Sequence, residues 1–230
     1  MQAIILAGGL GTRLRGIIKD VPKPMAPINN KPFLYYVFKW LEKYPVDKVI
    51  LSTGYKSESI SDYFGTSLNN IIIDYVHEEQ PLGTGGAIKY ALSKTSEENI
   101  LVLNGDTYFP VNLNTFYKVH ISNKSTLTIA LKRMKNFSRY GTVECRKNSV
   151  IKFNEKKYCA DGLINGGIYL INRNIFESEE MPEAFSFEKE ILEKEDASYK
   201  ITGYAFNNLF IDIGVPEDYS RAKLILAKVE

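Results

Sequence analysis

The feature that most constrains the fold is a short apolar run that leads directly into a glycine-rich loop. Residues 2–7 (QAIILA) are rich in β-forming side chains, which predicts a short buried strand. Residues 8–13 (GGLGTR) follow at once. Because glycine has no Cβ, backbone N–H groups in such a loop can approach an anion closely, and arginine suits multidentate contact with phosphate. The pattern predicts a strand that runs into a loop binding a polyphosphate.

Two familiar nucleotide-binding loops do not fit this segment. A Walker A loop needs Gly-Lys-Ser/Thr at a fixed spacing, which is absent here. The dinucleotide fingerprint of a Rossmann dehydrogenase needs a third small residue where Leu14 stands. A purely structural glycine turn stays open for the loop taken alone. Residues 20–24 (DVPKP) favour binding, because Lys23 lies between two prolines, which suits a stiff loop and not a helix.

Length, charge and cysteine content narrow the class of protein. A chain of 230 residues fits one large α/β domain, or a domain with a small lobe. The net charge of +2 gives no reason to expect nucleic acid or an acidic membrane as a partner. Cys145 and Cys159 make neither a disulfide framework nor a zinc site, so we expect a reduced, cytoplasmic location. The N-terminal apolar run is too short to span a membrane. His77 and His120 are interpreted as ordinary surface or core residues.

Strand and helix patterns alternate along the first half of the chain. Apolar residues at helical spacing predict a helix within residues 32–44. Further strands are expected at 48–53, 71–76 and 100–103, with helices at 57–64 and about 87–94 between them. The alternation predicts an α/β fold with a Rossmann-like, mostly parallel sheet flanked by helices. Ligands bind such sheets beyond the carboxyl ends of the strands, so we expect the segments that follow the strands to meet at one edge.

Two later features carry chemistry at predicted strand ends. Residues 78–87 (EEQPLGTGGA) allow the backbone to lie flat against a planar ligand, and Gln80 can both donate to and accept from a base edge. Asp106 ends one apolar run and Asp212 lies within another. Each carboxylate has a structural interpretation, as a turn former or a hydrogen-bonded group. With phosphates implied elsewhere, we favour Mg²⁺ binding, because this ion takes one or two carboxylates together with phosphate and water.

These motifs resemble the signature of a known family. Residues 8–14 (GGLGTRL), followed by Pro22-Lys23-Pro24, are similar to the sugar-1-phosphate nucleotidylyltransferases, and the resemblance covers nearly the whole chain. It implies a nucleotide-diphospho-sugar transferase fold with a small β-rich sugar-binding lobe. It also implies a single domain over 1–230, in which about 1–110 bind the nucleotide and about 111–230 bind the sugar and close the fold. No hexapeptide repeat is present, so no C-terminal β-helix is expected.

The resemblance implies a role for residues in four groups. The catalytic group is Arg13, Lys23 and Lys156. The nucleotide-binding group is Leu6, Ala7, Gly8, Gly9, Gly11, Thr12, Gln80, Gly83, Thr84 and Asn104. The sugar-binding group is Gly105, Gly141, Glu144, Asn165 and Gly166. The metal group, for Mg²⁺, is Asp106 and Asp212. The family's Glu-Lys-Pro motif stands here as Glu155-Lys156-Lys157, and the missing proline leaves Lys157 as a rival to Lys156.

The resemblance implies an enzyme that joins a nucleoside triphosphate to a sugar 1-phosphate and releases pyrophosphate. The implied substrates are GTP and D-glycero-α-D-manno-heptose 1-phosphate, for polysaccharide precursor synthesis. A mannose- or glucose-1-phosphate nucleotidylyltransferase with another triphosphate stays open, and a non-catalytic sugar-nucleotide sensor is a remote alternative. Nucleic acid and membrane partners are not expected, and a homodimer is kept as an option.

Overall fold

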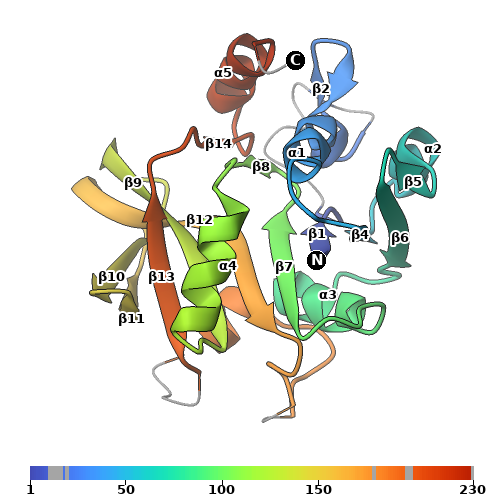
Figure 1. Cartoon of the computed structure of the whole chain (residues 1–230). Helices are drawn as coiled ribbons and strands as arrows, with labels where there is room; N and C mark the ends of the chain where they lie inside the picture. The colour runs from blue at the N-terminus through green and yellow to red at the C-terminus, as the bar shows by residue number, and fades with distance from the viewer. Residues whose placement is uncertain (10–17, 19–20, 178–179, 195–198, 229–230) are drawn as a thin grey trace.

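The computed structural model of the protein describes residues 1–9, 18, 21–177, 180–194 and 199–228. Its centre is one ten-stranded sheet in the order β10-β11-β13-β9-β12-β7-β1-β4-β6-β5 (Figure 1). The strands of this sheet are β1 (Gln2–Leu6), β4 (Lys48–Thr53), β5 (Ser67–Leu68), β6 (Ile71–His77), β7 (Asn99–Asn104), β9 (Leu127–Phe137), β10 (Thr142–Arg146), β11 (Ser149–Asn154), β12 (Cys159–Asn172) and β13 (Ile201–Phe206).

The remaining elements are helices, helical turns and two short ladders. The helices are α1 (Phe33–Leu41), α2 (Glu58–Phe64), α3 (Gly83–Leu92), α4 (Leu113–Ser122) and α5 (Pro216–Leu226). The 3₁₀ turn η2 (Lys23–Met25) follows the N-terminal segment, and the π-helical turn η3 (Glu188–Leu192) precedes β13. The ladders pair β2 (Pro27–Ile28) with β3 (Lys31–Pro32) and β8 (Thr107–Tyr108) with β14 (Ile211–Asp212).

Four neighbouring strands, β6, β4, β1 and β7, pair in parallel. In this part of the sheet Ile4 lies opposite Ile50 on one side and Val102 on the other. The strands predicted at 48–53, 71–76 and 100–103 are therefore confirmed, as is the predicted α/β class. Helix α3 begins at Gly83, earlier than the predicted start near Ala87, because the glycines of this segment lie inside the helix.

The other half of the sheet is mixed. Strand β12 runs antiparallel to both β7 and β9, whereas β13 runs parallel to β9. Strands β10 and β11 form an antiparallel hairpin at the outer edge, which corresponds to the expected β-rich lobe. The sheet as a whole is thus mixed, and the expected parallel pairing predominates in the half that contains β1.

The sheet is covered on both faces, so its central strands are buried. Ala3 and Ile5 of β1 pack in one hydrophobic core with α1, α4 and α5, while Ile4 points to a second core with α3 and η3. This alternation places the side chains of a single buried strand in two separate layers. None of the helices within the described residues is long and apolar enough to cross a membrane.

Candidate active site

Two cavities open beside the ends of the central strands. The first, which we call the glycine cleft, has a volume of about 810 Å³ and is lined by the end of β1, the start of α3 and the loop between β6 and α3. The second, which we call the lobe pocket, has a volume of about 480 Å³ and extends toward β10, β11 and β12. The cavities share three lining residues, Lys23, Asn104 and Asp106. Ligands in the two cavities would therefore meet at these residues.

The glycine cleft contains most of the described residues predicted to bind the nucleotide. These are Leu6, Ala7, Gly8, Gly9, Gly83, Thr84 and Asn104. Glycine at position 8 allows close approach of neighbouring groups, since a Cβ there would lie 2.6 Å from Oε1 of Glu78. Gly11, Thr12 and Arg13 lie outside the described residues, so their predicted roles stay predictions.

The loop between β6 and α3 differs from the prediction in one respect. Gln80 is exposed and is not among the residues that line the glycine cleft. Glu78, Glu79 and Pro81 of the same loop do line it. No motif in the sequence assigned a role to Glu78. Its place directly after β6 was the available signal, because residues at the carboxyl ends of parallel strands face the ligand site.

Lys23 and Asp106 form an ion pair at the junction of the cavities. The distance from Lys23 Nζ to Asp106 Oδ2 is 3.1 Å, and both side chains are largely shielded from solvent. Lys23 begins the turn η2 after Pro22, whose backbone is extended. Gly105, predicted to bind sugar, is buried; its N–H donates to the Leu6 carbonyl at 2.9 Å. It does not line either cavity but joins the ends of β7 and β1.

The two predicted metal ligands lie together although they are far apart in sequence. The β8–β14 ladder pairs Asp212 with Thr107, and the N–H of Ile213 donates to the Asp106 carbonyl at 3.0 Å. Burial, and then the nearby Asp106 carboxylate, raise the pKa of Asp212 above its usual value. Tyr140 donates to Asp212 Oδ2 at 3.0 Å.

These two carboxylates fit a divalent cation. Two negative charges held close together in a shielded site favour a cation between them, and carboxylate oxygens are hard donors. Within the described ranges no cluster of three or more Asp, Glu, His or Cys side chains suits a metal. Asp106 and Asp212 would therefore leave coordination positions for phosphate and water, as Mg²⁺ usually requires.

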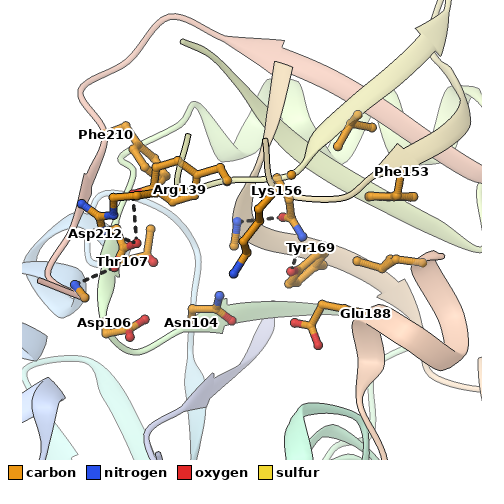
Figure 2. A pocket seen from close by; sticks show the side chains of 18 of the residues that line it. Asn104, Asp106, Thr107, Arg139, Phe153, Lys156, Tyr169, Glu188, Phe210 and Asp212 are labelled. Carbon is orange, nitrogen blue, oxygen red and sulfur yellow. Dashed lines mark hydrogen bonds and ion pairs between the residues drawn. The ribbon is translucent and has the colours of Figure 1, made fainter. Parts of the chain in front are cut away.

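The lobe pocket contains most of the residues predicted to bind the sugar phosphate. Gly141, Lys156, Asn165 and Gly166 line it. Figure 2 shows the Lys156 side chain pointing into the pocket, with Asp106 and Asp212 toward one end and Glu188 toward the other. Lys157, its rival, is not among the lining residues.

Both polar atoms of the Asn165 amide are occupied. Its Nδ2 donates to the Tyr169 hydroxyl at 2.7 Å, and its Oδ1 accepts from the Gly167 N–H at 2.9 Å. The pairing of β12 with β9 is irregular between Asn165 and Tyr169, so this stretch departs from the regular ladder at the pocket. Asn165 is therefore held in one orientation toward the cavity.

Glu144, like Gly105, is a predicted sugar ligand that does not line the lobe pocket. It lies exposed on β10, accepts from Asn154 Nδ2 at 2.9 Å, and does not line the pocket. The pocket instead contains Arg139, Tyr140 and Glu188, to which the sequence analysis gave no role. Arg139 and Tyr140 come from the turn between β9 and β10, and Glu188 comes from η3.

The chain is similar to known proteins over nearly its whole length. The family model described as Nucleotidyl transferase matches residues 2–229. The D-glycero-α-D-manno-heptose 1-phosphate guanylyltransferase of Aneurinibacillus thermoaerophilus is 55% identical over 223 residues, which is 97% of each chain. The enzyme of the same name from Campylobacter jejuni is 51% identical over 95% of this chain and 97% of its own.

Solved structures give the same result. HddC from Yersinia pseudotuberculosis is 36% identical, with a TM-score of 0.88 over 100% of this chain and 99% of its own. A second crystal structure of HddC is a complex with GMP-PN and has a TM-score of 0.87. The resemblance to the sugar-1-phosphate nucleotidylyltransferases is thereby confirmed. The chain belongs to the nucleotidyl transferase family.

Proposed function

We propose that this protein transfers a guanylyl group from GTP to D-glycero-α-D-manno-heptose 1-phosphate, giving GDP-heptose and pyrophosphate for polysaccharide precursor synthesis. The observation that carries the proposal is the meeting of the glycine cleft and the lobe pocket at Lys23, Asn104 and Asp106. Such an arrangement suits the union of two phosphorylated substrates. The names of the two relatives that are 55% and 51% identical over nearly the full chain support this pair of substrates.

The reaction needs positioning and charge neutralisation. A phosphate oxygen of the sugar 1-phosphate, already anionic, forms a bond to the α-phosphorus of GTP, and the bond from that phosphorus to the β-phosphate oxygen breaks. No protein nucleophile is required. Because two polyanions must approach each other, fixed positive charge is the main tool of catalysis.

Three basic side chains are proposed to supply this positive charge at different phosphates. Lys23, at the junction of the cavities, is proposed to contact the α-phosphate. Lys156, inside the lobe pocket, is proposed to contact the phosphate of the sugar. Arg13, which lies outside the described residues, is proposed to hold the β- and γ-phosphates with the backbone of the glycine loop.

A divalent metal ion fits the same scheme. Nucleotidyl transferases of this family generally use one, and we propose Mg²⁺ held by Asp106 and Asp212. When bound, the ion would supply positive charge to the phosphate oxygens. Tyr140 and the Gly214 N–H, which donates to Asp212 Oδ1 at 2.8 Å, orient one of the two carboxylates for this role.

Domain organisation and location are proposed on the same basis. We infer that the chain acts as one nucleotidyltransferase domain, since one sheet contains strands from both the nucleotide part and the sugar part. Cys145 and Cys159 are free thiols, which supports a location in the reducing cytoplasm. A homodimer stays a prediction.

The test is a ³¹P nuclear magnetic resonance experiment on the protein with GTP, heptose 1-phosphate and Mg²⁺. Transfer would replace the resonances of both substrates with those of free pyrophosphate and of the diphosphate bridge of GDP-heptose. A non-catalytic sensor would leave the substrate resonances unconverted while still binding the nucleotide. Unconverted substrates with measurable GTP binding would overturn the proposed activity.

A further inference from the structure

Arg139 lies between two carboxylates that come from separate elements. Its Nη2 is 3.7 Å from Oδ2 of Asp212, one of the two proposed metal ligands. Its Nη1 forms a hydrogen-bonded ion pair with Asp218, which is in the first turn of α5. Figure 2 shows Arg139 and Asp212 at the same end of the lobe pocket. One guanidinium thus connects a proposed metal ligand with helix α5.

The two contacts of Arg139 differ in kind. Its contact with Asp218 is a hydrogen bond as well as an ion pair, whereas the 3.7 Å separation from Asp212 leaves only an attraction between charges. Asp218 is itself held, because Arg221 Nη1 lies 3.5 Å from its other oxygen and Arg221 Nη2 donates to the Phe210 carbonyl at 3.0 Å. Arg139 is therefore anchored on α5 and stands near Asp212 without a hydrogen bond to it.

Other groups already orient the Asp212 carboxylate. Tyr140 donates to its Oδ2 at 3.0 Å, and the Gly214 N–H donates to its Oδ1 at 2.8 Å. The charge of Arg139 has a different consequence, because a metal ion at Asp212 competes with the guanidinium for the same carboxylate and like charges repel. The distance between Arg139 and Asp212 should therefore influence how tightly Asp212 binds a cation.

We propose that Arg139 is a positioning residue that sets the affinity of Asp212 for the metal ion, and that Asp218 limits this effect by holding the guanidinium toward α5. The inference rests on the proposed function, since it takes Asp212 as a metal ligand. Loss of Arg139 removes a competing positive charge, so it should tighten metal binding. Loss of the Asp218 charge leaves Asp212 as the remaining partner of the guanidinium, so it should weaken metal binding.

A purely structural role for Arg139 predicts a different pattern. The guanidinium also lies over the Tyr140 ring, 5.5 Å from its centroid, and so supports the turn between β9 and β10. If this support were its only role, loss of Arg139 and loss of the Asp218 charge would break the same ion pair and disturb the site in the same direction. Opposite changes in metal affinity do not arise from that common loss.

The experiment measures metal affinity directly, without nucleotide or sugar phosphate. Mn²⁺ is the probe, because the electron paramagnetic resonance signal of the free ion weakens on binding. Dissociation constants are measured on the full chain for the wild type, Arg139→Met, Asp218→Asn and the double variant. We expect Arg139→Met to bind Mn²⁺ about three- to tenfold more tightly than the wild type and Asp218→Asn about three- to tenfold more weakly, since Arg139 is partly exposed and solvent screens its charge.

The double variant separates an effect through Arg139 from the charge of Asp218 itself. Asp218→Asn removes a negative charge, and a direct loss of attraction for Mn²⁺ would persist when Arg139 is also replaced. An effect that acts through the guanidinium disappears in that background. We therefore expect the double variant to bind Mn²⁺ within about twofold of Arg139→Met.

Two control variants match the charges that are removed. Glu217→Gln removes an exposed carboxylate from the same turn of α5. Arg133→Met removes an arginine that is paired with Asp161 and lies outside both cavities. Both should bind Mn²⁺ within about twofold of the wild type. Thermal melting of each variant checks that it is folded.

Three results would overturn the inference. Weaker Mn²⁺ binding by both Arg139→Met and Asp218→Asn would make their ion pair a support for the turn only. Unchanged binding by Arg139→Met would show that the guanidinium does not act on the metal. A double variant that binds as weakly as Asp218→Asn would assign the effect to the charge of Asp218.

Asp212→Asn distinguishes this inference from the proposed function. If Asp212→Asn keeps the wild-type affinity for Mn²⁺, or if the wild type binds no Mn²⁺, the metal assignment fails and the inference fails with it. If Asp212→Asn loses Mn²⁺ binding but Arg139→Met does not gain it, the inference fails alone. Transfer of the guanylyl group is measured separately and does not enter these binding constants.

Discussion

The hydroxyl of Thr84 donates a 2.6 Å hydrogen bond to Oε2 of Glu188, which lies 104 positions later in the sequence. Thr84 is in the first turn of α3 and lines the glycine cleft, whereas Glu188 begins η3 and lines the lobe pocket. The same Thr84 oxygen accepts from the backbone N–H of Phe187 at 2.9 Å. One side chain thus joins the walls of the two cavities.

Replacement of Thr84 tests whether its contacts with Phe187 and Glu188 contribute to stability and to substrate binding. Thr84→Val removes a donor to a carboxylate and leaves the Phe187 N–H without its acceptor, so we expect a loss of about 1–3 kcal/mol in the free energy of unfolding. The Michaelis constants for both substrates should rise, because each cavity loses part of its support. Urea denaturation and steady-state kinetics measure these effects.

Ser186→Ala is the matched control for that substitution. Ser186 donates to the same Glu188 oxygen at 2.9 Å but has no bond to α3. Ser186→Ala should raise the Michaelis constant for the sugar 1-phosphate and leave the constant for the nucleotide unchanged. If Thr84→Val changes only the constant for the nucleotide, the two cavities are not joined through this contact.

Lys23 at the junction of the cavities should be needed for the chemical step. Lys23→Met removes a charge proposed to lie at the α-phosphate, so we expect kcat/KM to fall by about 10²–10³. Lys39→Met is the control, because Lys39 is also ion-paired, with Glu42 at 2.8 Å, but lies on α1 outside both cavities. A kcat/KM for Lys23→Met within threefold of the control would contradict the assignment.

Substitutions of Lys156 and of its neighbour Lys157 should differ in their effect on binding of the sugar 1-phosphate. Lys156→Ala is expected to raise the Michaelis constant for the sugar 1-phosphate by about tenfold or more, as loss of a charged contact usually does. Lys157→Ala should change it little, because only Lys156 of the two lines the pocket. Equal increases in the Michaelis constant for the two variants would contradict the assignment of the sugar phosphate to Lys156. A larger increase for Lys157→Ala would assign it to Lys157.

His120 should make the fold sensitive to acid. It is 1% exposed, and burial lowers its pKa from 6.5 to about 4. Its Nε2 lies 2.9 Å from Asn99 Oδ1, which only accepts, so the neutral ring carries its proton there and accepts from Thr128 at Nδ1. Below pH 6.5 the unfolded chain therefore takes up a proton that the folded chain does not.

The sign of this linkage is a loss of stability as the pH falls from 6.5 to about 4. The contribution of His120 should reach about 3 kcal/mol. Urea denaturation across this range should show a flatter pH profile for His120→Gln than for the wild type. Parallel profiles for the wild type and His120→Gln would refute the prediction.

The central strands and most of the junction between the cavities could be predicted from sequence, because local patterns encode them. Helix α4 could not, since its buried face combines Leu113 and Phe116 with a histidine, although Asn112 caps its N-terminus by accepting from the Thr115 N–H at 2.9 Å. Strand β12 was also missed. This strand has 14 residues and contains glycines, including Gly167 at φ +69°. Because glycine is uncommon inside strands, the sequence pattern did not predict a strand here.

Three-dimensional information was needed to decide which residues of the loop between β6 and α3 line the glycine cleft. Glu78 and Gln80 are two positions apart in one loop, and both carry suitable hydrogen-bonding groups. Only the fold shows that Glu78 lines the glycine cleft and that Gln80 is exposed outside its lining. The family resemblance grouped Asp106 with Asp212, but only the structure shows the ladder between β8 and β14 that brings these distant segments together.

The most direct test of the central claim is pyrophosphate release with Mg²⁺, measured as kcat/KM for GTP, ATP, UTP and CTP against three acceptors. The acceptors are D-glycero-α-D-manno-heptose 1-phosphate, mannose 1-phosphate and glucose 1-phosphate, with chelation of the metal as the control. We predict the highest value for GTP with the heptose 1-phosphate and loss of release on chelation. Preference for UTP or CTP, or for a hexose 1-phosphate, would contradict the account.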